Sequence, residues 1–181
     1  MPMSLNKTYS SKDYWSLPDD KRAELIDGQL YNMAPPGFIH QKLVFQIAKA
    51  ISNYVDSLNG NCEVIPAPFA VNLDANDNNW VEPDISVICD KNKLTARGCS
   101  GAPDLIVEVV SPSSQWHDCM RKLLLYQKHD VKEYWIVNPA ASTVMVYNFA
   151  KDNFTAYSFD DKIPVGIYNN ELSICISELL K

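Results

Sequence analysis

Hydrophobic residues recur at helical spacing in two long segments of the chain. In the first, from about Phe38 to Leu58, they are Leu43, Val44, Ile47, Ala48, Ile51, Tyr54, Val55 and Leu58. In the second, from Ser113 or Ser114 to Lys128, one face carries Trp116, Met120, Leu123, Leu124 and Gln127. Stripes of this kind predict two amphipathic helices, each with one buried face.

Shorter apolar runs, bounded by Gly, Pro, Asn and Asp, predict β-strands. They lie at about 62–73, 81–89, 104–110, 133–137 and 143–149, with weaker runs at 154–159 and 172–176. Pro66 and Pro68 lack the N–H that a sheet needs, so we expect the first run to be an edge or irregular strand. Nearer the N-terminus the segment 23–33 predicts a hairpin, because Asp27-Gly28 suits a type I′ turn.

Two short helices complete the predicted elements. Ser10 and Asp13 have the spacing of a capping box, which opens a helix that Pro18 stops after Leu17. Residues 177–180 predict a final helical turn. The order of elements predicts an α/β fold, in which helices flank one mixed central sheet and a hairpin lies near the N-terminus. Since 181 residues without repeats or linkers suit one domain, we expect a single domain over residues 1–181.

The composition narrows the class of protein. With 46% hydrophobic and 21% charged residues the chain is typical of a globular protein, and no apolar stretch approaches the roughly 20 residues of a membrane span. The N-terminus lacks the apolar core of a signal peptide, so we expect a cytoplasmic protein with no membrane partner. The five cysteines are widely spaced, without a Cys-x-x-Cys pair, which predicts free thiols and no disulfide framework or structural zinc site.

The net charge of −6 argues against tight non-specific binding to nucleic acid, which usually needs a basic face. Basic residues are only locally grouped, at Lys91, Lys93 and Arg97 and again at Arg121, Lys122, Lys128 and Lys132. An acidic balance is still compatible with a site in which bound cations offset carboxylates.

One glutamate breaks the most apolar strand. Glu108 lies in the run 105–110, which predicts a central strand that is covered on both faces. Removing its carboxylate from water costs several kcal/mol unless a partner compensates. Asp84 begins the preceding predicted strand, and Lys122 on the following helix is able to reach the strand ends. If the two strands pair, Asp84 and Glu108 converge on one hard cation.

This combination suits hydrolysis of a phosphodiester. Magnesium prefers oxygen ligands and is commonly held by one or two carboxylates plus water and a substrate phosphate. Such a cation polarises the phosphoryl oxygen, and a lysine such as Lys122 stabilises developing charge or positions the attacking water. We therefore expect magnesium or manganese as cofactor.

Taken in order, these residues resemble the PD-(D/E)XK nuclease superfamily, and in particular its Uma-two branch of restriction-endonuclease-like proteins. The segments that carry the resemblance are 24–30, Pro36-x-x-x-His40, Pro83-Asp84, 101–114, Lys122-Leu123-x-x-Tyr126 and 133–139. The superfamily places a lysine two residues after the acid, where this chain has Val110; in the Uma-two branch that lysine has migrated to the next helix, which matches Lys122. The resemblance implies a DNA endonuclease in which Asp84 and Glu108 are metal ligands and Glu24 and His40 are auxiliary site residues.

Other interpretations of the same residues stay open. Glu108 can form a structural ion pair with Lys122 or Arg121, Asp104 can be a further ligand or a structural acid, and Tyr126 is expected to pack. The alternative function is a catalytically silent nuclease-like fold that acts as a binding or assembly module. A nuclease that cuts both strands of a duplex usually needs two sites, so the nuclease hypothesis also predicts a homodimer.

Overall fold

The structure, a computed structural model, describes residues 7–111 and 116–181. Its α-helices are α1 (Ser11–Trp15), α2 (Phe38–Ser57), α3 (Trp116–Lys128) and α4 (Ile176–Leu179). Three short 3₁₀ helices are η1 (Lys91–Lys93), η2 (Phe149–Lys151) and η3 (Gly166–Tyr168). Within this part of the chain, no helix combines the length and the apolar character that crossing a membrane requires.

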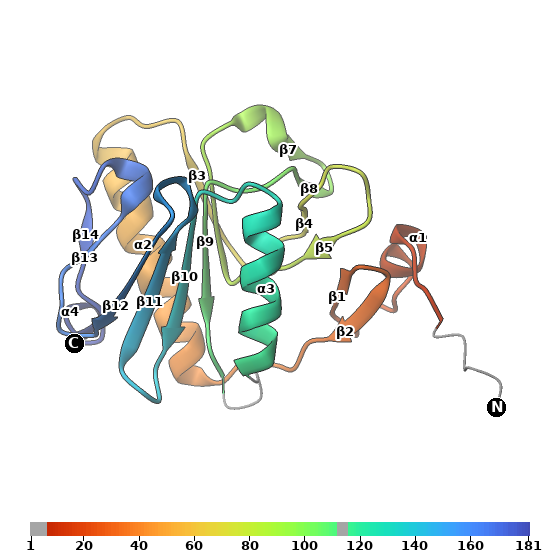
Figure 1. Ribbon diagram of the computed structural model, residues 1–181, viewed down its shortest axis with the longest axis horizontal. Coiled ribbons are helices and arrows are strands. Elements are labelled where there is room, and N and C mark those ends of the chain that lie inside the picture. The colour runs from red at the N-terminus through yellow and green to blue at the C-terminus, as the bar shows by residue number, and fades with distance from the viewer. Residues whose placement is uncertain (1–6, 112–115) are drawn as a thin grey trace.

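The central sheet has six strands in the order β12-β11-β10-β9-β6-β3. They are β3 (Glu63–Pro66), β6 (Ile85–Ile88), β9 (Leu105–Val109), β10 (Glu133–Asn138), β11 (Thr143–Asn148) and β12 (Asn153–Ser158). Only the β9–β10 pair is parallel, because α3 forms the crossover between these two strands, and the other neighbours are antiparallel. Helix α2 lies on one face of this sheet and α3 on the other (Figure 1).

The mixed central sheet is as predicted, but the remaining strands form a second six-stranded sheet, in the order β2-β1-β5-β4-β8-β7, and do not extend the first. Its strands are β1 (Ala23–Ile26), β2 (Gln29–Asn32), β4 (Val71–Asn72), β5 (Trp80–Val81), β7 (Leu94–Thr95) and β8 (Gly98–Ser100), and β13 (Ile163–Pro164) pairs separately with β14 (Ser173–Ile174). The predicted strand 62–73 divides into β3 and β4 after Pro66, and 81–89 divides into β5 and β6 at Pro83. Proline cannot donate to a ladder, so each of these segments changes sheet there.

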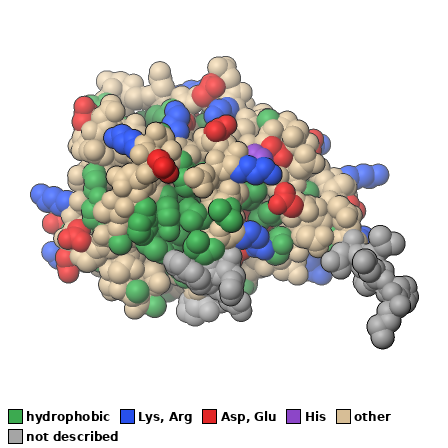
Figure 2. All heavy atoms as spheres, in the orientation of Figure 1, with side chains coloured by type: hydrophobic (Ala, Val, Ile, Leu, Met, Phe, Trp, Pro, Cys, Tyr) green, Lys and Arg blue, Asp and Glu red, His purple; other side chains and the backbone are tan. Residues whose placement is uncertain are grey.

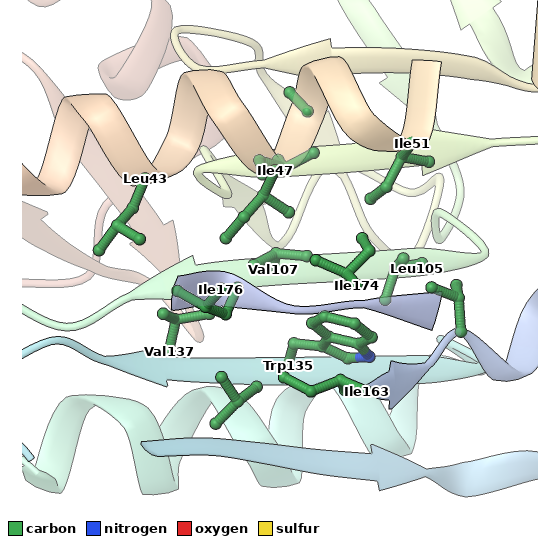
Figure 3. Close-up of a cluster of buried hydrophobic side chains, with 14 of the residues drawn as sticks. Leu43, Ile47, Ile51, Leu105, Val107, Trp135, Val137, Ile163, Ile174 and Ile176 are labelled. Carbon is green, nitrogen blue, oxygen red and sulfur yellow. The ribbon is translucent and has the colours of Figure 1, made fainter. Parts of the chain in front are cut away.

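The main core lies between α2 and the central sheet (Figure 3). Alternation along β9 and β10 directs Leu105, Val107, Trp135 and Val137 to this face. The predicted stripe of α2 packs over β9, and Ile163, Ile174 and Ile176 pack beside Trp135 and Val137 (Figure 3). Burying each such side chain fully contributes about 1.5–3 kcal/mol. The predicted helix extends one residue beyond the observed C-terminal end, because α2 ends at Ser57 and Leu58 is 59% exposed.

The opposite face packs against α3 but is only partly covered. Ile106, Tyr134 and Ile136 are fully buried beneath the helix, whereas the sheet continues past α3 to β11 and β12. Figure 2 shows an apolar patch over these strands and the adjoining helix. Leu124, which we expected on the buried face of α3, is 66% exposed. The start of this helix at 113 or 114 and the side chain of residue 116 lie outside the described residues.

The N-terminal elements form as the local sequence predicts. Ser10 caps α1, and the capping box with Asp13 is complete, although the helix ends two residues before Leu17. β1 and β2 form the predicted hairpin, and both turn residues, Asp27 and Gly28, have positive φ as a type I′ turn requires.

The cysteine prediction was wrong in one respect, since Cys62 and Cys89 form a disulfide. Cys62 precedes β3 and Cys89 follows β6, and the antiparallel register pairs Glu63 with Ile88, so the two cysteines are the next cross-strand pair. Their 27-residue separation in sequence does not reveal this register. Cys99, Cys119 and Cys175 are free, as expected.

Candidate active site

Pairing between β6 and β9 brings the two predicted metal ligands to the same end of the central sheet. The register aligns Ile85 with Val107, so Asp84, just before β6, lies opposite the end of β9 that carries Glu108. Asp84 is held there because its Oδ2 accepts a 2.8 Å hydrogen bond from the backbone N–H of Val109. The two acids therefore lie beside each other on neighbouring strands, as the sequence predicted for paired strands.

Glu108 points to the α3 face, where two side chains of that helix meet it. Nζ of Lys122 lies 3.0 Å from its Oε1, and the hydroxyl of Tyr126 donates to the same oxygen at 2.7 Å. Lys122 and Tyr126 are one helical turn apart and both are buried. The predicted position of Lys122 near the strand ends is thus the observed one, and Tyr126 does more than pack.

Glu24 enters the site from the hairpin. Its side chain is 4% exposed, and its Oε1 lies 2.9 Å from Nζ of Lys122. The backbone N–H of Glu82 donates to the same oxygen at 3.0 Å. Lys122 consequently bridges two carboxylates, one from each six-stranded sheet.

His40 comes from the first turn of α2. Its Nε2 lies 3.1 Å from Oδ2 of Asp84, and its Nδ1 lies 3.2 Å from the side-chain oxygen of Gln41. The imidazole is 11% exposed. His40 thus contacts a predicted metal ligand rather than the core alone.

A cavity of about 550 Å³ joins these residues. Its lining includes all five predicted site residues: Glu24, His40, Asp84, Glu108 and Lys122. Asp104 is not among them, because it sits at the opposite end of β9, where it pairs with Lys132 at 2.6 Å and accepts a hydrogen bond from the backbone N–H of Cys89. The open question about Asp104 is therefore answered in favour of a structural acid.

Burial and mutual repulsion shape the electrostatics. Burial raises the pKa of the Glu108 carboxyl; the attraction of Lys122 opposes this rise, while the charges of Asp84 and Glu24 add to it. Burial acts to lower the pKa of Lys122, but Glu108 and Glu24 outweigh it and raise that pKa well above its usual value. For His40 burial likewise acts to lower the pKa, but the hydrogen bond and charge of Asp84, with Gln41 and Glu108, outweigh it and raise that pKa above its usual value. The cluster holds more negative than positive groups at close range, which favours an added cation.

The residues fit a cation bound mainly by water and two acids. Among residues 7–111 and 116–181, no group of three or more His, Cys, Asp or Glu side chains is arranged to hold a metal ion. Within the same residues Oδ1 of Asp84 and Oε2 of Glu108 have no hydrogen bond or ion pair, so each acid has one oxygen available. Magnesium is commonly bound by one or two carboxylates with water and substrate phosphate completing the shell, so this donor set suits it.

Four polar contacts in or beside the pocket were not predicted from the sequence. The guanidinium of Arg121 lies 3.5 Å from the ring centroid of Tyr31 and forms an ion pair with Asp118. Arg22 donates to Glu82 from both Nε and Nη2. Tyr126 could have been found, because it lies one turn beyond Lys122 on the same stripe, whereas the contact between Arg121 and Tyr31 depends on the docking of the hairpin.

A cysteine also lines the cavity but is unsuited to nucleophilic attack. Burial raises the pKa of the Cys119 thiol to about 11, so less than about one part in a thousand is thiolate at neutral pH.

Comparison with known proteins shows the family to which the chain belongs. The family model Uma2, described as "Putative restriction endonuclease", matches residues 11–164, and the chain belongs to this family. It is 27% identical over 135 residues to the uncharacterized protein slr1290 of Synechocystis, covering 74% of this chain and 70% of that protein.

The fold has a solved counterpart. A structure from Anabaena variabilis, described as a "putative nuclease belonging to DUF820", superposes with a TM-score of 0.77 at 21% identity and covers 94% of this chain and 96% of that one. This likeness confirms the predicted restriction-endonuclease-like α/β fold.

Proposed function

We propose that this protein is a metal-dependent endonuclease that hydrolyses DNA phosphodiester bonds. The observation that carries the proposal is the cluster of Asp84, Glu108 and Lys122 in one cavity, with an oxygen of each acid left available. Membership of the Uma2 family and the nuclease named for the Anabaena structure support it.

Each residue has a distinct part in the proposed reaction. Asp84 and Glu108 would hold magnesium or manganese, which when bound polarises the phosphoryl group and lowers the pKa of water. Lys122, kept protonated by Glu24 and Glu108, would offset negative charge that develops on the phosphoryl oxygens. Glu24 would orient that ammonium group, and His40 would orient the carboxylate of Asp84.

The proposed substrate implies an assembly. One active site would cleave one DNA strand. Cleavage of both strands of a duplex is therefore expected to use two copies of the chain as a symmetric homodimer. Sedimentation with and without a DNA duplex measures this state directly.

The first test is plasmid cleavage in magnesium or manganese by wild-type protein and by the Glu108→Gln variant. We expect metal-dependent nicking by wild type and a loss on the order of 100-fold or more in the variant, because one ligand charge is removed from the site. Glu178→Gln is the matched control, since it makes the same change at an exposed glutamate of α4.

The outcomes separate the two functions considered. Equal activity in wild type and Glu108→Gln would assign the cleavage to a contaminant and reject the proposed site. No cleavage by either protein, together with no heat of metal binding by calorimetry, would favour the catalytically silent binding or assembly module.

A further inference from the structure

Four cationic side chains line the cavity, and each of them pairs with at least one acid. Lys122 pairs with Glu24 and Glu108, and His40 pairs with Asp84. Arg22 places both its Nε, at 3.0 Å, and its Nη2, at 2.6 Å, on one oxygen of Glu82. A polyanion that enters the cavity therefore finds these three charges largely neutralised.

Arg121 differs from the other three cations. Only its Nη2 is engaged with an acid, Asp118, while its Nε is buried and has no hydrogen-bond partner anywhere in the part of the chain that the structure describes. A buried guanidinium N–H without an acceptor is costly, because its desolvation is not offset. The position is therefore suited to an acceptor that the protein itself does not supply.

The guanidinium of Arg121 is also held in place before any ligand arrives. It stacks on the ring of Tyr31, which β2 presents beside Glu24 of β1, the two being direct cross-strand partners. Stacking on an aromatic face fixes the plane of the guanidinium. The Arg121 side chain as a whole is 33% exposed and lines the cavity, so the N–H groups that Asp118 does not engage can meet phosphate oxygens there. The hairpin thus contacts two consecutive residues of α3. Glu24 forms an ion pair with Lys122, and Tyr31 stacks on Arg121.

From these contacts we propose that Arg121 is a phosphate anchor, which binds a DNA phosphodiester next to the one held between Asp84, Glu108 and Lys122. It rests on the proposed function in naming DNA as the ligand. Tyr31 is a positioning residue, because it acts through the guanidinium. Asp118 balances the charge of Arg121 when no DNA is bound and engages only its Nη2.

The test measures DNA binding rather than cleavage, by fluorescence anisotropy of a labelled short duplex in magnesium. All proteins carry Glu108→Gln, so that the duplex stays intact whether or not the wild-type protein is a nuclease. Two double variants are compared in this background, one with Arg121→Gln and one with Lys128→Gln. The second removes the same charge from an exposed position on the same helix.

We expect Arg121→Gln to weaken binding about tenfold or more and to lower the slope of log affinity against log salt by about one. Lys128→Gln is expected to change affinity less than about threefold. Added Tyr31→Leu should weaken binding in the same direction as Arg121→Gln, because it releases the guanidinium.

A purely structural function for Arg121 predicts a different result. Arg121→Gln would then lower the melting temperature but match Lys128→Gln in affinity and in salt slope, and the proposal would be overturned. Arg121→Lys covers the case in which the glutamine variant unfolds: it keeps the charge without the planar edge, so wild-type affinity in this variant would also overturn the proposal. Failure of the wild type to cleave plasmid would reject the nuclease while leaving these binding results to decide on Arg121.

Discussion

At the scale of single residues, two buried tyrosines form a natural matched pair. Tyr126 and Tyr134 pack edge to face with ring centroids 4.9 Å apart, and both are fully buried. The Tyr126 hydroxyl donates to Glu108, whereas the Tyr134 hydroxyl has no partner within the described residues. The same substitution to phenylalanine therefore isolates the value of one hydrogen bond to a carboxylate.

We expect Tyr126→Phe to lower the free energy of unfolding by about 1.5–3 kcal/mol, since it removes a hydrogen bond to a buried acid. Tyr134→Phe is expected to be neutral or slightly stabilising, because it removes an unpaired buried hydroxyl. Urea unfolding in EDTA measures both. Equal destabilisation of the two variants would show that ring packing, and not the contact with Glu108, dominates.

Residue-level reasoning from the sequence found the acids and the lysine of the site because each breaks a pattern. Glu108 interrupts an apolar strand, Asp84 follows a strand-breaking proline, and Lys122 borders an apolar stripe. Glu24 and His40 were predicted only through the family resemblance, because a hairpin acid and a histidine on a helix have many structural explanations. Arg121 was noted only as one of a group of basic residues and as an alternative partner of Glu108, because its stacking on Tyr31 depends on how the hairpin docks.

At the scale of elements, local sequence predicts most helices and strands but not how strands are shared between sheets. The capping box of α1 and the turn of the hairpin follow from neighbouring residues alone. The division of 62–73 and 81–89 between two sheets depends instead on long-range pairing, and so does the register that brings Cys62 to Cys89. These features therefore leave no local signal in the sequence.

The disulfide supplies the prediction at this scale. It joins β3 to β6 across 27 residues, and closing a loop of that length in the unfolded chain stabilises the fold by about 3–4 kcal/mol in the chain-entropy model. We expect the double variant Cys62→Ala/Cys89→Ala to lose stability of that order in urea unfolding, while Cys175→Ala, at a partly exposed free thiol, changes it little.

Whether Cys62 and Cys89 are oxidised in the cell also tests the predicted cytoplasmic location. Mass spectrometry of unreduced peptides would contradict the structure if it found Cys62 and Cys89 as free thiols in protein purified with thiols blocked. A cytoplasmic location stays a prediction, and a fully oxidised pair in cells would argue against it, because the cytosol keeps most thiols reduced.

At the scale of the whole molecule, the negative net charge and the acids of the cavity both favour binding of a divalent cation. The chain carries a net charge of −6, and four of its acids line one cavity. Asp118 pairs with Arg121, whereas Glu24, Asp84 and Glu108 crowd around Lys122 and His40. Their repulsion is a cost that the fold bears without a metal, and Lys122 and His40 offset only part of it. A divalent cation that binds the folded chain and not the unfolded one stabilises it by about 2.7 kcal/mol at 100 times its Kd.

We therefore expect magnesium and manganese to raise the melting temperature of the wild-type protein in a concentration-dependent way. Asp84→Asn and Glu108→Gln should remove this response, because each deletes one of the two ligand charges. Glu178→Gln should retain it. The comparison is of the shift on adding metal and not of the starting temperature, since removing one of three crowded acids can stabilise the metal-free fold even as it abolishes binding. A shift of the same size in all four proteins would place the cation on the acidic surface in general and would reject Asp84 and Glu108 as its ligands.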